Sequence, residues 1–401
     1  MSTSLGVAVI GAGMAGKAHA DGYRTAPTVY ESTLPEVRLV SIADVNAPLA
    51  EAAARRFGYS RHDTSWEAVV QADDVDVVSI VVANHLHQPI LEAALAAGKH
   101  VLCEKPLSDT LASARSMAET GRAARERGIV SSVGFVYRRA TGLATIRDYI
   151  ASGVLGKVLH FSGRYWCDYG CSPKAPMSWR YKGPMGSGAM GDVGSHLSYI
   201  AEFLAGDIVA VSGGRLSQVI HERPLPLGAV VGHAHVEVSD ETEPVENDDY
   251  ASFSAHFASG GAGVLEVSRV AAGHPNGLEV EVFCENGAAR WSQERPSEIQ
   301  LYLNDDSDGQ CGYRTVHLGP AHPYIAGGLA MDAPGVGFGQ NNLFVYQARA
   351  FLEEVAGLPE SDCLPRCATL DEGVHTMAVQ EAVVASAESG GATVSLLSQD
   401  Q

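Results

Sequence analysis

The sequence predicts an α/β protein of two domains, a doubly wound parallel sheet followed by an α/β domain with a large, mainly antiparallel open sheet. Three observations carry this prediction. A glycine-rich turn follows the first apolar run in "VAVIGAGMAG". Apolar strands then alternate with helical segments, as in a parallel sheet. The later part of the chain is rich in short β segments separated by glycine turns. We place the two domains at 1–138 and 139–401.

The composition limits the classes of protein that fit. The chain has 401 residues, of which 46% are hydrophobic and 19% charged, so it can form two packed domains. A net charge of −19 argues against a nucleic acid or an anionic membrane as partner. The sequence predicts no signal peptide, and no stretch approaches the roughly 20 apolar residues that span a bilayer. Seven cysteines without a C-x-x-C pair predict reduced thiols and a cytoplasmic location.

The first glycine cluster predicts a dinucleotide site. Gly11, Gly13 and Gly16 form G-x-G-x-x-G between an apolar strand and an alanine-rich helix. In this motif the first glycine allows a tight turn, the second admits the pyrophosphate, and the third lets the helix pack on the strand. The N–H groups at the helix start then face the phosphates. We predict that Gly11, Gly13, Met14 and Ala15 contact the cofactor. The alternative is a glycine-rich turn with a structural role only.

Asp44 indicates which dinucleotide is bound. It ends the second apolar strand, where a carboxylate can bond the ribose hydroxyls and would repel a 2′-phosphate. NAD is therefore the predicted cofactor, and NADP is less favoured. Asp44 lies 28 positions after Gly16, so we interpret the polar stretch 24–36, with its two prolines, as an insertion in the connection.

Two polar clusters follow later strands of this domain. They are "NHLH" at 84–87 and "EKP" at 104–106. Ligands of doubly wound sheets lie outside the carboxyl ends of the strands, so we assign Asn84, His87, Glu104 and Lys105 to the cofactor site. For His87 a role at the start of a helix is an equal alternative.

The stretch "GDVGSHLSYI" places an acid and a histidine four residues apart, Asp192 and His196. Apolar positions spaced by three and four predict an amphipathic helix ending at Gly206. On such a helix both side chains face the same way. The glycines and serine around them leave room for a substrate. The alternative is a capping Asp192 and a surface His196.

For two further features of the sequence we predict no functional role. The acidic run "VEVSDETEPVENDDY" at 236–250 is predicted to be a solvated loop that enters a strand. The histidine pairs 85/87 and 233/235 lack the acid–histidine spacing of metal sites, so no metal is predicted.

Over nearly its whole length the sequence resembles the Gfo/Idh/MocA oxidoreductases, the family of glucose–fructose oxidoreductase and inositol dehydrogenase. The resemblance rests on "GVAVIGAGMAGKAH", "NHLH…AALAAGKHVLCEKPL", "GSGAMGDVGSH" and "GPAHPY". It implies an N-terminal Rossmann domain and a C-terminal α/β domain whose open sheet packs against another subunit, in a homo-dimer or homo-tetramer. The sequence departs from the family pattern at Ala83, Val136 and Tyr199.

The resemblance also implies a catalytic group of Lys105, Asp192 and His196. Histidine has a pKa suited to removing a hydroxyl proton near neutral pH. A lysine can stabilise the developing negative charge and relay the proton. An aspartate can hold a hydroxyl or orient the other two groups. These residue types together suit the oxidation of an alcohol.

Further residues are candidates for contact with a sugar. A sugar ring stacks on an aromatic face and its hydroxyls pair with charged groups, although a structural role is equally open for these side chains. The candidates, besides the catalytic group, are Tyr137, Arg138, Asp168, Trp179 and Arg180.

The predicted function is an NAD-dependent dehydrogenase that acts on a ring hydroxyl or ketone of a sugar, anhydrosugar or cyclitol. Two alternatives remain open. One is a glycoside-cleaving relative that oxidises its substrate transiently with tightly held NAD. The other is a non-catalytic nicotinamide-sensing protein on the same fold.

Overall fold

The computed structural model describes residues 4–30, 34–228, 230, 236–304, 311–328, 331–333 and 336–396. The chain forms two compact units. Unit 1 comprises residues 1–139 and 319–375, and unit 2 comprises residues 140–318 and 376–401. This division differs from the single boundary that we predicted at residue 138, because residues 319–375 belong to the first unit.

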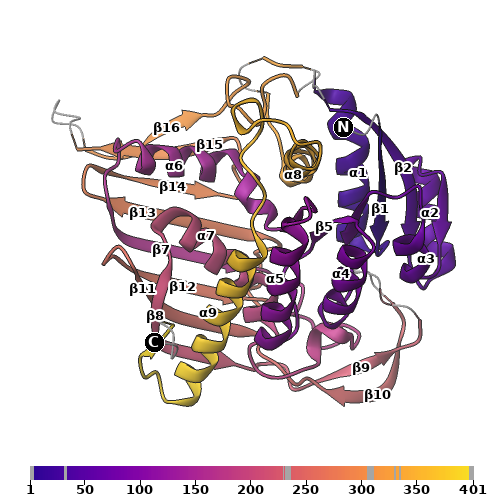
Figure 1. Ribbon diagram of the computed structural model, residues 1–401. Helices are drawn as coiled ribbons and strands as arrows, with labels where there is room; N and C mark the ends of the chain where they lie inside the picture. The colour runs from indigo at the N-terminus through magenta and orange to yellow at the C-terminus, as the bar shows by residue number, and fades with distance from the viewer. Residues whose placement is uncertain are drawn as a thin grey trace. The chain divides into compact units, whose positions relative to one another are not determined.

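Unit 1 is built on a parallel sheet of six strands in the order β3-β2-β1-β4-β5-β6 (Figure 1). This order reverses between β1 and β4, and such a switch point is where dinucleotides bind. The central strands are buried on both faces, as their apolar runs require. The strands are β1 (Ser4–Ile10), β2 (Glu36–Ala43), β3 (Arg61–Asp63), β4 (Val77–Ile80), β5 (His100–Cys103) and β6 (Ser131–Val133).

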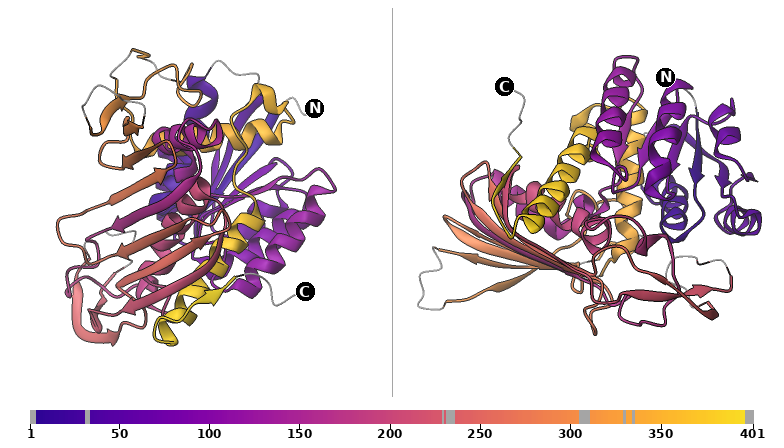
Figure 2. Two further views of the ribbon diagram at one scale, coloured as in Figure 1. Left: turned by 90° about the vertical axis from the view of Figure 1, so that its left-hand side faces the viewer. Right: turned by 90° about the horizontal axis from the view of Figure 1, so that it is seen from below.

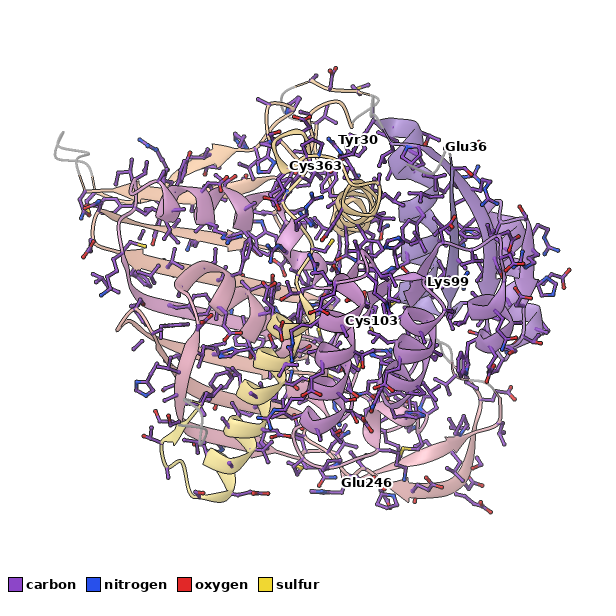
Figure 3. The ribbon with its side chains drawn as sticks, viewed as in Figure 1. Tyr30, Glu36, Lys99, Cys103, Glu246 and Cys363 are labelled. Carbon is purple, nitrogen blue, oxygen red and sulfur yellow. The ribbon has the colours of Figure 1, made fainter. Side chains whose placement is uncertain are left out.

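Helices connect these strands and cover the sheet. Helices α8, α1 and α2 pack side by side, as do α3, α4 and α5. Side-chain hydrogen bonds hold the connections between these elements in place. Lys99 (Figure 3), just before β5, donates from Nζ to the carbonyl oxygens of Ala72 and Val75 at 2.9 and 2.8 Å. The helices are α1 (Met14–Val29), α2 (Ala47–Phe57), α3 (Trp66–Gln71), α4 (His87–Ala96), α5 (Leu111–Arg125) and α8 (Gln340–Val355), with short turns η1 (Asn84–Leu86), η2 (Val136–Arg139) and η5 (Glu360–Asp362).

Helix α8 explains why a late segment belongs to the first unit. It packs closely on α1, and a Cβ atom added to Gly22 would lie 2.7 Å from the carbonyl oxygen of Phe344. Tyr30 (Figure 3), which ends α1, donates from its hydroxyl to the carbonyl oxygen of Tyr324 at 2.7 Å. The chain therefore returns to cover the first helix, which no local pattern near residue 320 reveals.

The interpretation of 24–36 as a connection is wrong for its first part. Helix α1 continues through Pro27 to Val29. Proline is tolerated here because the helix ends within three residues, and Thr28 donates from its hydroxyl to the carbonyl oxygens of Arg24 and Thr25. The packing of α1 on α8 favours the helix over the local preference for a turn.

Unit 2 is built on a mainly antiparallel sheet of nine strands in the order β16-β15-β14-β13-β7-β12-β11-β8-β17, in which only the pair β7–β12 is parallel among the described strands. The strands are β7 (Val158–Trp166), β8 (Ile208–Ser217), β11 (Tyr250–Phe257), β12 (Ala262–Ser268), β13 (Gly277–Cys284), β14 (Gly287–Ser292), β15 (Glu298–Leu303), β16 (Arg314–His317) and β17 (Val394–Ser395). A separate hairpin pairs β9 (Glu222–Pro226) with β10 (Val238–Pro244).

Helices cover one face of this sheet (Figure 2). Helix α7 (Ser195–Ala205) packs on β7 and β12, and α6 (Thr141–Ala151) packs on β14. Helix α9 (Leu370–Glu388) runs across the division of the chain, and its last turns lie against Gly214 of β8. Along β11 the buried residues Ala251, Phe253, Ala255 and Phe257 alternate with more exposed ones, as the sequence predicts. The predicted fold class is thus confirmed.

The acidic run does not form the solvated loop that we predicted. Residues 238–244 form β10, and the final residues Asn247, Asp248 and Asp249 are fully buried. Charge along the sequence does not show whether a carboxylate has partners inside the fold. No helix in the described part of the chain combines the length and the apolar character needed to cross a bilayer.

The close approach of α1 and α8 yields a test of the unit division. We expect Gly22→Val to lower the free energy of unfolding by about 1–3 kcal/mol, because its side chain would press on the backbone of α8. Thr28→Val, on the exposed side of the same helix, should change it by less than about 0.5 kcal/mol. Urea denaturation measures both, and equal stability of the two variants would contradict this packing.

Candidate active site

The first glycine turn has the conformation that the motif predicts. Gly11 has a φ of 108°, a conformation that favours glycine, and a Cβ atom there would lie 1.9 Å from the carbonyl oxygen of Val81. A Cβ atom on Gly16 would lie 1.9 Å from the carbonyl oxygen of Gly11. Both glycines are therefore required by contacts within unit 1, between β1, β4 and α1.

Gly13 is different, because a Cβ atom added there would meet no atom within 4 Å. It is the N-cap residue of α1, where no described side chain accepts a hydrogen bond from the helix start. The next residue, Met14, is 60% exposed. Space and backbone N–H donors thus coincide at the start of a sixteen-residue helix, and this fits the pyrophosphate of a dinucleotide.

Asp44 lies directly after β2 and is bonded to the glycine turn. One carboxylate oxygen accepts from the N–H of Ala12 at 2.9 Å, and the other accepts from the N–H of Asn46 at 2.9 Å. The side chain is only partly buried. These bonds hold the carboxylate beside the turn that receives the pyrophosphate, as expected of a group that meets the adenosine ribose.

The EKP turn is held by a buried histidine that the sequence analysis missed. Glu104 follows β5 and the buried Cys103 (Figure 3). Its Oε1 lies 2.8 Å from Nε2 of His19, and its Oε2 accepts from the N–H of Lys105 at 3.0 Å. His19 is 2% exposed. Both oxygens of Glu104 thus act inside unit 1, where they fix the backbone that carries Lys105.

This contact continues as a chain of hydrogen bonds into the sheet. Nδ1 of His19 lies 3.1 Å from the hydroxyl of Ser79, which lies 2.9 Å from the hydroxyl of Tyr23. Burial raises the pKa of Tyr23 well above its ordinary value, so this phenol remains neutral. The histidine of "GKAH" was part of the recognised pattern, but its spacing alone does not reveal its partner.

His87 has the structural contacts that the alternative interpretation expected. It begins α4 and is buried, with Nδ1 near the carbonyl oxygens of Pro106 and Leu107 and Nε2 3.1 Å from that of Val82. Burial lowers its pKa. The ring therefore ties the end of β4 to the EKP turn, and contact with the cofactor stays a prediction. Asn84, in η1, is partly exposed beside it.

In unit 2, Asp192 and His196 lie on a continuous helical segment whose first part is a π-helical turn, η4 (Met190–Gly194). Both side chains are partly exposed among buried neighbours. Single π turns often occur at functional sites. Asp192 lies inside this turn, so it is not the N-cap residue that the alternative interpretation required.

Two tyrosines of β7 and the following loop contact these side chains. The hydroxyl of Tyr169 donates to Oδ2 of Asp192 at 2.9 Å. Burial and the Asp192 carboxylate raise the pKa of Tyr169 well above its ordinary value, so it remains a donor. The ring of Tyr165 lies 6.1 Å from that of His196, between centroids. The sequence analysis missed Tyr169, because nothing distinguishes it from its neighbours in "CDYGC".

The small residues around Asp192 have a reason other than the predicted room for a substrate. Gly191, Gly194 and Ser195 are buried. A Cβ atom on Gly191 would lie 3.1 Å from the carbonyl oxygen of Gly186, and one on Gly194 would lie 2.8 Å from Sδ of Met190. The glycines allow the turn to pack closely on itself.

The remaining predicted substrate residues have varied surroundings. In unit 1, Tyr137 is buried and accepts from Nε2 of Gln340 at 3.1 Å, and Arg138 pairs with Glu372 at 2.9 Å. In unit 2, Trp179 is 53% exposed, and the guanidinium of Arg180 stacks 4.6 Å from its ring centroid.

Asp168 is partly exposed next to Tyr169, and its carbonyl oxygen accepts from Cys171 at 2.9 Å. Trp179 and Arg180 therefore offer an exposed aromatic and cationic surface, whereas Tyr137 is held inside its unit.

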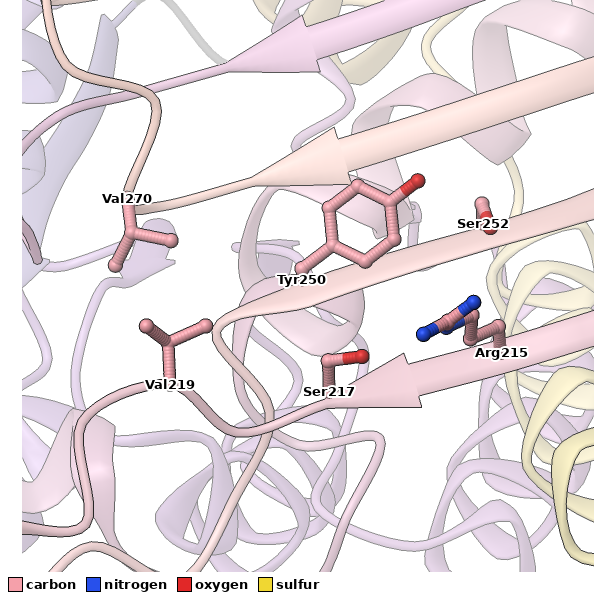
Figure 4. A pocket seen from close by; sticks show the side chains of 6 residues that line it. All are labelled: Arg215, Ser217, Val219, Tyr250, Ser252 and Val270. Atoms are coloured by element: carbon pink, nitrogen blue, oxygen red, sulfur yellow. The ribbon is translucent and has the colours of Figure 1, made fainter.

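Two other features of the described residues fall outside this set. The described residues contain no group of three or more histidine, cysteine, aspartate or glutamate side chains placed for a metal ion. The histidine pair at 233 and 235 lies outside the described residues. A cavity of about 480 Å³ in unit 2 is lined by residues of β8, β11 and the segments that follow β8 and β12 (Figure 4). It contains none of the predicted site residues.

Both units of the chain contain residues that match a known protein family. Residues 5–135 match the oxidoreductase family with an NAD-binding Rossmann fold, and residues 143–290 match the Gfo/Idh/MocA C-terminal domain. The chain belongs to the Gfo/Idh/MocA oxidoreductases. The family predicted from the sequence is confirmed, and so are the NAD-binding domain and the assignment as an enzyme.

Several members of the family are similar along nearly the whole chain. Levoglucosan dehydrogenase of Pseudarthrobacter phenanthrenivorans is 37% identical over 357 residues, which cover 88% of this chain and 90% of that protein. A structure of levoglucosan dehydrogenase with NADH and levoglucosan has a TM-score of 0.87, with 32% identity over 98% of this chain and 100% of that one. An oxidoreductase domain protein from Kribbella flavida has a TM-score of 0.88 at 34% identity, covering 99% of this chain and 100% of that one.

The position of Asp44 in this Gfo/Idh/MocA oxidoreductase yields a test of its cofactor preference. We expect kcat/KM with NAD to exceed that with NADP in the wild type, because the carboxylate repels a 2′-phosphate. Asp44→Ala should lower the ratio of kcat/KM with NAD to kcat/KM with NADP, mainly by weakening the binding of NAD. Asp63→Ala, at the end of the neighbouring strand β3, serves as the control and should keep the ratio. A wild type that uses NADP as well as NAD would contradict the role of Asp44.

Proposed function

We propose that this enzyme is an NAD-dependent dehydrogenase that oxidises a ring hydroxyl of a sugar, anhydrosugar or cyclitol, or reduces the corresponding ketone. The observation that carries the proposal is similarity along both units to proteins named levoglucosan dehydrogenase, and one solved structure of that name contains NADH and levoglucosan. An anhydrosugar is therefore the first substrate to test.

The cofactor residues of the proposal lie in unit 1. Bound NAD would supply the carbon that accepts the hydride. The backbone at Gly13, Met14 and Ala15 would bind its pyrophosphate at the open start of α1, and Asp44 would bind its ribose. Asn84 and His87 follow β4 at the carboxyl edge of the sheet, where the rest of a dinucleotide extends.

His196 is the proposed base. Oxidation of an alcohol requires that the hydroxyl proton leave as the hydride leaves carbon. A neutral imidazole can take this proton near pH 7 without a large change in its pKa. His196 lies on α7, and the ring of Tyr165 lies beside its imidazole.

Lys105 and Asp192 assist in the proposal. The ammonium group of Lys105 stabilises negative charge on the substrate oxygen in the transition state and can relay the proton. Its backbone is fixed by Glu104, which His19 holds in turn. Asp192 accepts from a second hydroxyl or orients the histidine, while its Oδ2 is held by Tyr169.

The proposed substrate contacts come from both units and include exposed and buried side chains. Trp179 offers an aromatic face on which a sugar ring can stack, and Arg180 offers hydrogen-bond donors for its hydroxyls. Asp168, Tyr137 and Arg138 complete the proposed set. We also propose that the enzyme acts in the cytoplasm as a homo-dimer or homo-tetramer. None of the described cysteines forms a disulfide, and the described helices of unit 2 cover only one face of the large sheet.

A substrate screen tests the proposal. The purified enzyme with NAD should form NADH with levoglucosan or with one member of a panel of free sugars and cyclitols. A glycoside-cleaving relative would instead release a free sugar without net NADH. Binding of NAD with no turnover on any member of the panel would favour the non-catalytic alternative and contradict the proposal.

The proposed base and charge stabiliser have a defined kinetic signature. We expect His196→Ala to lower kcat and kcat/KM together by about 10²–10⁴-fold, because the lost interaction acts in the transition state. Lys105→Ala should lower kcat and kcat/KM by at least the same factor. Wild-type kcat/KM should rise with pH through neutrality as the base loses its proton, and this limb should be absent in His196→Ala.

Matched substitutions separate these effects from loss of structure. His256→Ala and Lys157→Ala remove the same residue types from exposed positions in unit 2 and should leave turnover unchanged. The dissociation constant for NAD should be nearly unchanged in His196→Ala. Near-normal turnover of His196→Ala on the true substrate would remove it as the base.

A further inference from the structure

Three consecutive residues, Asn247, Asp248 and Asp249, are fully buried immediately before β11, with none of their surface exposed. Burial of two adjacent carboxylates is costly unless each has donors around it. Each of the three side chains is in fact hydrogen-bonded within unit 2, and Asn247 and Asp249 share the partner Arg269. The contacts of the middle residue concern the segment that carries Asp192 and His196.

The carboxylate of Asp248 binds the backbone just before the π-helical turn. Its Oδ1 accepts from the N–H groups of Gly186 and Gly188 at 2.7 and 3.1 Å, and its Oδ2 accepts from the N–H of Met190 at 2.7 Å. Its own carbonyl oxygen accepts from Ala189 at 2.9 Å. The N–H groups of Gly188, Ala189 and Met190 stand at the start of the helical segment, where they have no partners inside the helix, and that of Gly186 lies in the turn before it.

The backbone is shaped to fit closely around this carboxylate. Gly186 has a φ of 94°, which favours glycine. A Cβ atom on Gly188 would lie 2.1 Å from the carbonyl oxygen of Asp248. The N–H of Asp192 then donates to the carbonyl oxygen of Gly188 at 2.9 Å, so Asp192 is one hydrogen bond away from the segment that Asp248 holds.

Asp249 and Asn247 fix the position of Asp248. Asp249 pairs with the buried Arg269 at 2.7 Å and accepts from the N–H groups of Val219 and Ile220. Asn247 accepts from Nη2 of Arg269 at 2.8 Å and donates to the carbonyl oxygen of Arg180 at 3.1 Å. Close by, Glu246 (Figure 3) accepts from the N–H of Gly183 at 2.7 Å.

We propose that Asp248 is a positioning residue for the reaction, which binds the N–H groups of Gly186, Gly188 and Met190 at the start of the π-helical turn and thereby sets the place of Asp192 and His196. The inference rests on the proposed function, because it gives those two side chains their roles. A carboxylate at a helix start accepts hydrogen bonds from the N–H groups there, and the helix dipole favours a negative charge at that end. Asp248 itself does not contact the substrate.

Asp248→Asn tests the proposal, because asparagine keeps the shape but replaces one acceptor oxygen by a donor group. We expect kcat to fall by about 10–100-fold, since small misplacements of reacting groups have effects of this order. The dissociation constant for NAD should change by less than about twofold, because unit 1 binds the cofactor. Hydrogen exchange, read by mass spectrometry, should become faster in the peptide 184–196.

Glu353→Gln is the matched control in unit 1. Glu353 is a buried carboxylate that accepts from the N–H of Leu364 at 2.8 Å and from Nε of Arg349 at 2.7 Å. Its substitution should lower the melting temperature but leave kcat and exchange in 184–196 unchanged. If Asp248→Asn shows that same pattern, the role of Asp248 is structural only and the proposal is overturned.

A second variant covers the case in which Asp248→Asn does not fold. Gly188→Ala keeps the carboxylate but forces it away from the N–H groups, and the same loss of kcat and faster exchange in 184–196 are expected. Unchanged kcat would overturn the proposal. Normal turnover of His196→Ala would instead contradict the proposed function, while the exchange measurement would still report whether Asp248 holds the turn.

Discussion

Backbone N–H groups at the start of a helix need an acceptor, and this chain meets that need in two different ways. At α1 the start is open: Gly13 leaves space, and no described side chain caps the helix. At the helical segment of unit 2 the corresponding donors bind the carboxylate of Asp248. The first arrangement suits an external anion, such as the pyrophosphate of NAD. The second leaves no such place and instead makes the start of the helix rigid.

The buried contacts of unit 2 extend this rigidity to the segment proposed to bind the sugar. Arg223 donates to the carbonyl oxygens of Gly170 and Ser172, and its guanidinium lies 3.9 Å from the ring centroid of Tyr181. The guanidinium of Arg269 lies 4.6 Å from the same ring. The backbone on both sides of Trp179 is therefore anchored by buried arginines. Anchoring of this kind would hold the proposed substrate contacts in place before a substrate binds.

Much of the fold and part of the site could be predicted from the sequence. The turn at Gly11, Gly13 and Gly16 could be predicted because the dinucleotide motif has a fixed spacing, and Asp44 is a candidate for the ribose because it ends a strand. Lys105, Asp192 and His196 are candidates because they stand in recognised motifs. The contacts that hold these segments could not be predicted. His19 and Glu104, which contact each other, are 85 positions apart, and Tyr169 and Asp192 are 23 apart. Contacts between distant positions leave no local pattern.

The errors have equally physical causes. The acidic run was interpreted as solvated because its charge is visible in the sequence, whereas the N–H groups that pair with Asp248 are not. Pro27 suggested a connection, but helix packing prevailed over its local preference. Residues 319–375 return to unit 1 because α8 covers α1, and only the folded chain shows this pairing.

In the proposed reaction, a ring carbon of the substrate gives its hydrogen to the cofactor. The most direct measurement uses an anhydrosugar or cyclitol that is deuterated at its ring carbons, with NAD and the wild-type enzyme. The account predicts that the reduced cofactor isolated from this reaction carries one deuterium atom on its nicotinamide ring, as read by mass spectrometry. Reduced cofactor without deuterium, or cleavage of the sugar with no accumulation of reduced cofactor, would contradict it.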